Sequence, residues 1–172
     1  MSMDEARSPV GAAFRDRFAT NPEAARITLR AEGRVDPNGT CKIANRSGDN
    51  VEVHPALGGS GLMACSGDIL LESLVGCAGV TLGQVAKAME IDLGETFIRA
   101  EGDLDFRGLL GLAEEVPVGL ERIRLHFDLE TPANAEEIAA LIRLTERYCV
   151  VSRTLSPSLE VTYATAAKGR VV

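Results

Sequence analysis

The sequence lacks several features that would assign it to a functional class directly. It has no Trp, and aromatic residues make up only 4% of its 172 residues. That scarcity weakens any case for a platform of side chains that stack on bases or sugars. Acidic residues outnumber basic ones by 25 to 18, which gives a formal net charge of -7. Because phosphate binding needs clustered positive charge, we expect no nucleic-acid partner.

Long apolar runs are also missing. No stretch approaches the roughly 18 consecutive apolar residues of a membrane span, so we expect no membrane partner. Residues 1–17 mix acidic and arginine residues without the apolar core of a signal peptide. The 4 cysteines do not form a dense disulfide framework in a chain of this length. These features predict a soluble, cytoplasmic protein.

The length and composition that remain are those of one globular domain. The chain is 45% hydrophobic and 25% charged, as globular domains of this size commonly are. Pro9 and the apolar spacing after it predict a helix that ends near Asn21-Pro22. We therefore expect a helical extension over residues 1–25, followed by a single domain over residues 26–172.

Alternating apolar and polar residues predict the strands of this domain, and Asn134 with Glu137 predicts a capping box at the start of its second helix. A first helix is expected within residues 65–91, N-capped by Ser66 or Asp68. The predicted strands cover residues 27–31, 41–43, 51–53, 96–106, 123–129 and 159–163. The second helix covers residues 134–148, and residues 150–157 are expected to be a connection. The order βββ-α-ββ-α-β is that of an α+β fold.

The first of these helices has an unusual composition. Its apolar residues occupy more than one face, which is typical of a buried helix. It also keeps Gly76, Gly79 and Gly83, each of which costs roughly 0.5–1 kcal/mol relative to Ala. A helix that keeps three glycines is expected to pack closely against another backbone. We therefore predict a buried central helix.

Two cysteines have suggestive positions, Cys77 in the central helix and Cys149 at the end of the second helix. Neither belongs to a CxxC pair, and His54 and His126 show no metal-binding spacing. We therefore expect no metal and no cofactor. The alternative for any single cysteine is an inert, buried small side chain, and we expect Cys41 and Cys65 to be incidental.

The run Gly67-Asp68-Ile69-Leu70-Leu71-Glu72-Ser73-Leu74-Val75-Gly76-Cys77-Ala78-Gly79-Val80-Thr81-Leu82 resembles the central-helix signature of the OsmC/Ohr family. This family comprises the osmotically inducible and organic hydroperoxide resistance proteins. A second matching element is Tyr148-Cys149 near the end of the next helix, and Gly58-Gly59 matches the family's approach to the first helix. The resemblance covers roughly residues 26–165 and shares the order βββ-α-ββ-α-β.

The resemblance implies an intertwined homodimer and a thiol-dependent peroxidase. In such an enzyme the Cys77 thiolate attacks a hydroperoxide and becomes a sulfenic acid, which condenses with Cys149 to a disulfide. A dithiol reductant, lipoyl-type or thioredoxin-like, would restore both thiols. The Cys-Pro common in the family's second motif is Cys149-Val150 here.

The family also places an acid and an arginine beside the reactive thiolate. The family's Glu is replaced by Gly67, which makes Asp68, one residue later, the candidate acid; a plain helix cap is the alternative role for Asp68. We favour Arg46 as the arginine, with Arg30 and Arg34 as alternatives.

Two other functions stay open at this point. One is a non-enzymatic relative that binds an apolar small molecule between subunits, with its cysteines merely packed. The other is a redox sensor that forms the same disulfide without turnover. The feature that divides the enzymatic from the binding hypothesis is Gly67, which stands where the family's reductases have an acid. If Asp68 does not take over that role, the binding hypothesis is favoured.

Overall fold

The structure is a computed structural model that describes residues 33–35, 41–43, 50–106, 114–155 and 159–166. The described residues divide into two compact units, with the boundary inside helix α2 after Leu70, and each is described by itself. The helix predicted within residues 1–25 and the strand predicted over residues 27–31 lie outside the described residues. The expected boundary between an extension and a domain near residue 25 stays a prediction.

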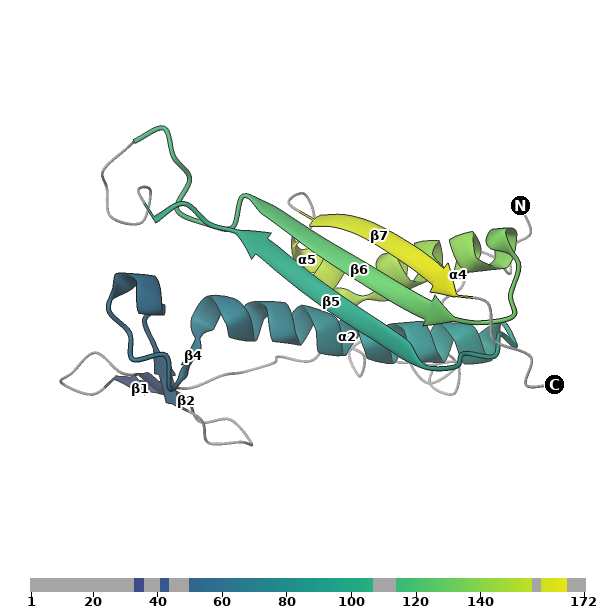
Figure 1. Cartoon of the computed structure of the whole chain (residues 1–172), viewed down its shortest axis with the longest axis horizontal. Coiled ribbons are helices and arrows are strands. Elements are labelled where there is room, and N and C mark those ends of the chain that lie inside the picture. The colour runs from purple at the N-terminus through teal and green to yellow at the C-terminus, as the bar shows by residue number, and fades with distance from the viewer. Residues whose placement is uncertain (1–32, 36–40, 44–49, 107–113, 156–158, 167–172) are drawn as a thin grey trace, which may run out of the picture. The chain divides into compact units, whose positions relative to one another are not determined.

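The larger unit is a three-stranded sheet covered on one face by helices (Figure 1). Its strands are in the order β5-β6-β7, with β5 antiparallel and β7 parallel to β6. Its elements are β5 (Thr96–Asp103), β6 (Arg122–Glu130), α4 (Ala135–Tyr148), α5 (Val150–Leu155) and β7 (Leu159–Ala166), together with α2 (Ser66–Ala88) from Leu71 on. The parallel pairing of β6 with β7 requires a crossover connection, which α4 and α5 supply. The predicted mixture of helices and strands and their order in this unit are confirmed.

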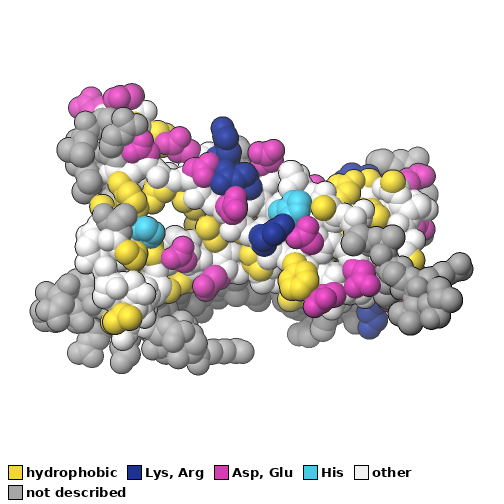
Figure 2. Space-filling view, in the orientation of Figure 1, with side chains coloured by type: hydrophobic (Ala, Val, Ile, Leu, Met, Phe, Trp, Pro, Cys, Tyr) yellow, Lys and Arg dark blue, Asp and Glu magenta, His cyan; other side chains and the backbone are white. Residues whose placement is uncertain are grey.

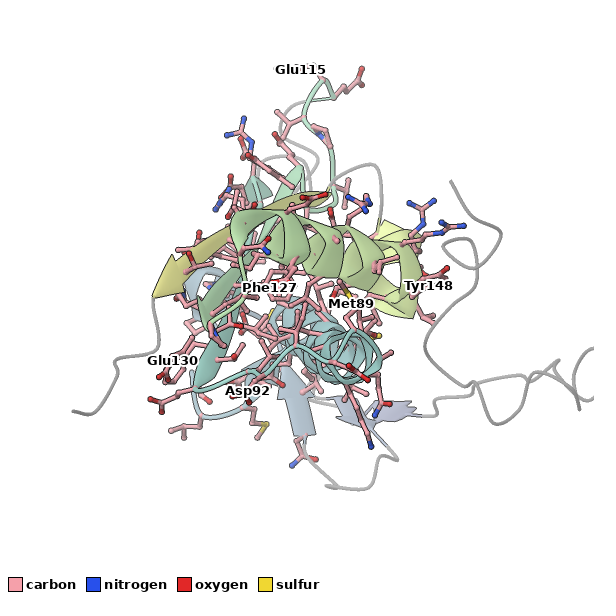
Figure 3. All side chains as sticks on the ribbon, turned by 90° about the vertical axis from the view of Figure 1, so that its right-hand side faces the viewer. Met89, Asp92, Glu115, Phe127, Glu130 and Tyr148 are labelled. Atoms are coloured by element: carbon pink, nitrogen blue, oxygen red, sulfur yellow. The ribbon has the colours of Figure 1, made fainter. Side chains whose placement is uncertain are left out.

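The central strand β6 provides much of the core. Ile123, Leu125, Phe127 and Leu129 are each at most 2% exposed, as the alternation in the sequence predicted. Figure 3 shows Phe127 pointing from the sheet into the layer between the sheet and the helices. Full burial of side chains of this size contributes roughly 1.5–3 kcal/mol each. The sheet therefore fixes the position of the helices behind it.

The other face of this sheet is solvated and charged (Figure 2). The Arg124 guanidinium donates to both carboxylate oxygens of Asp103 at 2.6 and 2.8 Å, and Arg99 donates to Asp128 at 2.7 Å. The hydrogen bonds from Arg124 lower the pKa of Asp103. These cross-strand pairs link β5 to β6 on the face that carries no core.

Among the described residues, helix α2 is buried on one face. Leu74, Ala78, Leu82 and Val85 lie in the core, but Val80 is 70% exposed. An 18-residue window of α2 has a mean hydropathy of 1.6, so by length and composition alone it is apolar enough to cross a membrane. The inner face of this helix nevertheless packs in the core of the larger unit.

The three glycines of α2 do not share one role. A Cβ at Gly79 would lie 3.2 Å from Ile98 Cδ1, so this glycine lets α2 approach β5 of its own chain. At Gly76 and Gly83 a Cβ would meet nothing within 4 Å among the described residues. The close approach found at Gly79 is thus to a side chain of β5, and the close packing predicted for Gly76 and Gly83 stays a prediction.

Helix α4 begins with the predicted capping box. Asn134 Oδ1 accepts hydrogen bonds from the backbone N–H groups of Glu136 and Glu137, at 2.9 and 3.0 Å. The Glu137 carboxylate accepts from the Asn134 N–H at 2.8 Å. The prediction from the Asn134 and Glu137 spacing is confirmed.

We expect Asn134→Ala to lower the free energy of unfolding by about 1 kcal/mol, because it leaves two N–H donors without their acceptor. The measurement is urea unfolding followed by circular dichroism. The matched control is Asn134→Asp, which keeps an acceptor oxygen at the same place and is expected to unfold like the wild type. Equal stability of the alanine and aspartate variants would contradict this role for the side chain.

The smaller unit is a four-stranded sheet that leads into α2. Its elements are β1 (Gly33–Val35), β2 (Cys41–Ile43), β3 (Asn50–Glu52), the 3-10 helix η3 (Pro55–Leu57) and β4 (Ala64–Cys65), with strand order β1-β2-β3-β4. The first three strands form an antiparallel meander, so the predicted strands over 41–43 and 51–53 are confirmed. The two-residue strand β4, parallel to β3, was not predicted.

The glycine-rich approach to α2 is held by one carboxylate. Glu52 accepts from Ser60 Oγ at 2.8 Å, from Ser60 N at 3.1 Å and from Met63 N at 3.2 Å. These hydrogen bonds lower the pKa of Glu52, with the Ser60 side chain as the largest cause. A Cβ at Gly59 would overlap the Val53 carbonyl oxygen, so only glycine fits there.

Candidate active site

Cys77 lies in the middle of α2, on the side that packs against the core. Its thiol is free and partly buried. The residue one turn later, Thr81, donates from Oγ1 to the Cys77 carbonyl at 2.8 Å. The helix therefore holds Cys77 rigidly while leaving its side chain partly accessible.

Cys149 lies at the junction of α4 and α5 and is fully buried. Its N–H donates to the Thr145 carbonyl at 2.9 Å, and its own carbonyl accepts from Arg153 N at 3.0 Å. Between these bonds the backbone is extended, with φ -73 and ψ 111. Cys149 thus ends one helix and begins the next. The connection expected over residues 150–157 is wrong in part, because residues 150–155 form α5.

The sulfur of Cys149 takes the place of the usual oxygen at the start of α5. Ser152 N donates to Cys149 Sγ at 3.5 Å, the bond that an N-cap side chain accepts from the third helical residue. Cysteine is not among the residues preferred at this position. The residue types alone therefore did not predict the helix.

The fold brings the two predicted thiols together. Cys77 and Cys149 come from different helices, yet Cys77 packs against the core cluster that contains Cys149 and lies near enough to affect its pKa. Burial is the largest cause that raises the pKa of Cys149, and the contact with Cys77 raises it further. The nearby Ser152 acts in the opposite direction, since its side chain and its backbone N–H both lower that pKa.

A partly buried acid lies one turn before Cys149 on α4. Burial raises the pKa of Glu146, since desolvation disfavours its charged form. Sequence spacing had not singled it out.

The predicted acid lies at the start of α2. Asp68 is exposed in the first turn of this helix, within the smaller unit. Arg34 lies in β1 with its side chain undescribed, and Arg30 and Arg46 lie outside the described residues. Their assigned roles stay predictions.

Ser152 is the residue that the sequence analysis missed. It is 3% exposed, and its Oγ has no hydrogen-bond partner among the described residues. Its place three residues after Cys149 was visible in the sequence. Its burial against the sulfur depends on the α4–α5 bend, and no sequence pattern predicted that bend.

Among the described residues, the two thiols belong neither to a metal site nor to a hollow on the β5-β6-β7 sheet. Within the described ranges, no three His, Cys, Asp or Glu side chains converge closely enough to hold a metal ion. A hollow of about 490 Å³ lies on the β5-β6-β7 sheet and includes neither thiol. Its lining residues are Glu95, Phe97, Asp128, Leu129, Glu130, Ala164 and Thr165.

Solved structures share the fold at low sequence identity. An OsmC-like protein from Mycoplasma pneumoniae superposes with a TM-score of 0.67 at 16% identity, covering 83% of this chain and 99% of that one. An organic hydroperoxide resistance protein from Elizabethkingia anophelis gives 0.64 at 19% identity, covering 83% and 99%. The organic hydroperoxide resistance protein OsmC from Legionella pneumophila gives 0.62 at 20% identity, covering 81% and 97%.

Sequence comparison agrees with the fold. No curated protein sequence is significantly similar to the chain. The family model described as OsmC-like protein, however, matches residues 58–164. This range includes α2 with Cys77 and the α4–α5 junction with Cys149. The chain therefore belongs to the OsmC-like protein family.

Proposed function

We propose that this protein is a thiol-dependent peroxidase that reduces hydroperoxides through Cys77 and Cys149. The observation that carries the proposal is the contact between two free thiols, one partly exposed and one fully buried. Paired in this way, one thiol reaches a substrate while the other is protected from it. The names of structural neighbours from Elizabethkingia anophelis and Legionella pneumophila, organic hydroperoxide resistance proteins, support the substrate class.

The chemistry balances with these two thiols and one reductant. The Cys77 thiolate attacks the outer oxygen of the hydroperoxide, the O–O bond breaks, and the alkoxide takes up a proton to leave as an alcohol. Cys149 then attacks the sulfur of the Cys77 sulfenic acid, and water leaves as the disulfide forms. A lipoyl-type or thioredoxin-like dithiol reduces that disulfide by thiol exchange and is itself oxidised. A reducing compartment such as the cytoplasm fits this cycle.

A cation beside Cys77 would favour its thiolate. We assign this role to Arg46, with Arg30 and Arg34 as the alternatives, and to Asp68 the role of holding the guanidinium in place. If a second copy of the chain supplies this arginine, peroxidase activity would depend on dimer formation.

A homodimer is part of the proposal. The uncovered face of α2 carries Gly76, Val80 and Gly83, and a second α2 of the same kind fits against such small residues. Two-fold symmetry would give two equivalent sites. An interface formed around these helices would belong to the large, apolar, obligate class of roughly 2,000 Å² or more.

The proposal is tested by treating the reduced protein with one equivalent of an organic hydroperoxide and mapping thiols by mass spectrometry. We expect loss of two thiols and a Cys77–Cys149 disulfide. Cys149→Ser is expected to react once, stop at the sulfenic acid and proceed to sulfinic acid under excess oxidant.

Other results would point to the other functions. A disulfide that forms but is not turned over by any dithiol would identify a redox sensor. Intact thiols after treatment would exclude the peroxidase and favour a binding protein.

A further inference from the structure

We infer that Ser152 stabilises Cys149 as a thiolate, both when it attacks Cys77 and when it leaves during reduction. The inference rests on the proposed function, because it names a residue that assists the disulfide steps of that cycle. Two observations support it: Ser152 lies against the Cys149 sulfur, and its buried hydroxyl has no hydrogen-bond partner among the described residues.

The backbone of Ser152 already points at the reacting atom. Its N–H donates to Cys149 Sγ at 3.5 Å in the first turn of α5. Because Cys149 is fully buried, water cannot solvate the charge that appears on its sulfur. A thiolate in such a place needs donors from the protein.

The hydroxyl of Ser152 is free to be one of these donors. Hydroxyls in helices commonly donate to the carbonyl four residues earlier, and Thr81, Thr145 and Thr154 do so here at 2.8 to 2.9 Å. Ser152 does not, for its Oγ is buried without a hydrogen-bond partner among the described residues. A buried hydroxyl left in this state is costly and calls for an explanation.

The thiol form of the site explains it. A neutral Cys149 sulfur is only a weak hydrogen-bond acceptor. When the proton leaves, the sulfur becomes a strong, charged acceptor beside an uncommitted O–H. The Ser152 side chain already lies near enough to lower the pKa of Cys149. The Ser152 hydroxyl therefore gains a hydrogen-bond acceptor only when Cys149 is a thiolate, which is the form that reacts.

The test uses the full chain with Cys41 and Cys65 replaced by serine, so that Cys77 and Cys149 are the only thiols. The aromatic disulfide DTNB oxidises Cys77, the more exposed thiol, to a mixed disulfide and releases one coloured thiolate. Cys149 then attacks the Cys77 sulfur and expels the second. Two protein thiols become one disulfide, and the reagent disulfide becomes two thiolates, so electrons balance without any peroxide.

In Ser152→Ala the pH midpoint of the second release is expected to rise by about one unit, since a hydrogen bond to a charged group is lost. At neutral pH a smaller fraction of Cys149 is then thiolate, but each thiolate is more nucleophilic. The two effects together should make the second release about threefold slower. Above the midpoint the difference should vanish or reverse. The control Thr154→Val removes an exposed hydroxyl from the same helix and should match the wild type.

A purely structural role predicts something else, namely a lower melting temperature and equal slowing at every pH. We expect Ser152→Ala to melt no lower than the wild type, because it removes an unpartnered buried hydroxyl. An unchanged pH profile, or a parallel slowing at all pH values, would overturn the inference, as would a wild type that releases only one thiolate. A wild type that closes this disulfide but consumes no hydroperoxide would refute the peroxidase function instead. The pH dependence of the second release would still test the role of Ser152.

Discussion

Cys77→Ser is expected to abolish hydroperoxide consumption, with a loss on the order of a thousandfold or more. A serine hydroxyl remains protonated at neutral pH and is a far weaker nucleophile than a thiolate, so the first step has no substitute. The replacement is nearly isosteric, and Cys77 is only partly buried. We therefore expect the variant to fold, as judged by circular dichroism and thermal unfolding, and to fail only in a coupled assay with a dithiol reductant.

The matched control is Cys65→Ser, which removes another free, partly buried thiol. It should keep wild-type consumption. Loss of activity in this control but not in Cys77→Ser would move the reactive thiol to Cys65. Comparable consumption by the Cys77→Ser variant would remove Cys77 from the mechanism.

Val80→Arg is expected to raise the dissociation constant of a homodimer by on the order of a hundredfold or more. Val80 is 70% exposed in the chain and lies at the centre of the uncovered face of α2. Burying an arginine there against its own symmetry mate would place two unpaired positive charges together in an apolar contact. Sedimentation at low micromolar concentration measures the effect.

The control is Ala139→Arg, which adds the same charge on an exposed position of α4 and should leave association unchanged. If the activating arginine comes from the second chain, Val80→Arg should also lose activity in proportion to the monomer formed. A wild type that sediments as a folded monomer would refute the dimer. So would equal association of the two arginine variants.

The choice of Val80 shows where inference from the helix composition was incomplete. From the sequence, Gly76, Gly79 and Gly83 were expected to allow close packing of this helix against another backbone. In the structure Gly79 faces Ile98 of β5, so a large side chain there would disturb the chain's own core. Helical spacing told us that the glycines were needed for close packing. It did not tell us which glycine faces which neighbour.

Much of the larger unit was determined by the sequence itself. The strict alternation of β6 set both its strand and its buried face, because period-two patterns leave only one way to bury four apolar residues. Asn134 and Glu137 fixed the start of α4, because a capping box depends only on local spacing. The cysteine-bearing motifs fixed the family, which the match over residues 58–164 confirmed.

What only the tertiary structure decided is the environment of the second thiol. The contact of Cys77 with Cys149, the helix α5 that starts on a cysteine sulfur and the buried hydroxyl of Ser152 all depend on the bend between α4 and α5. No residue in that stretch has a strong turn preference, since Cys149-Val150-Val151 contains neither Gly, Pro, Asn nor Asp. The bend follows instead from burying Cys149 against the core, and long-range packing of this kind leaves no periodic signal in the sequence.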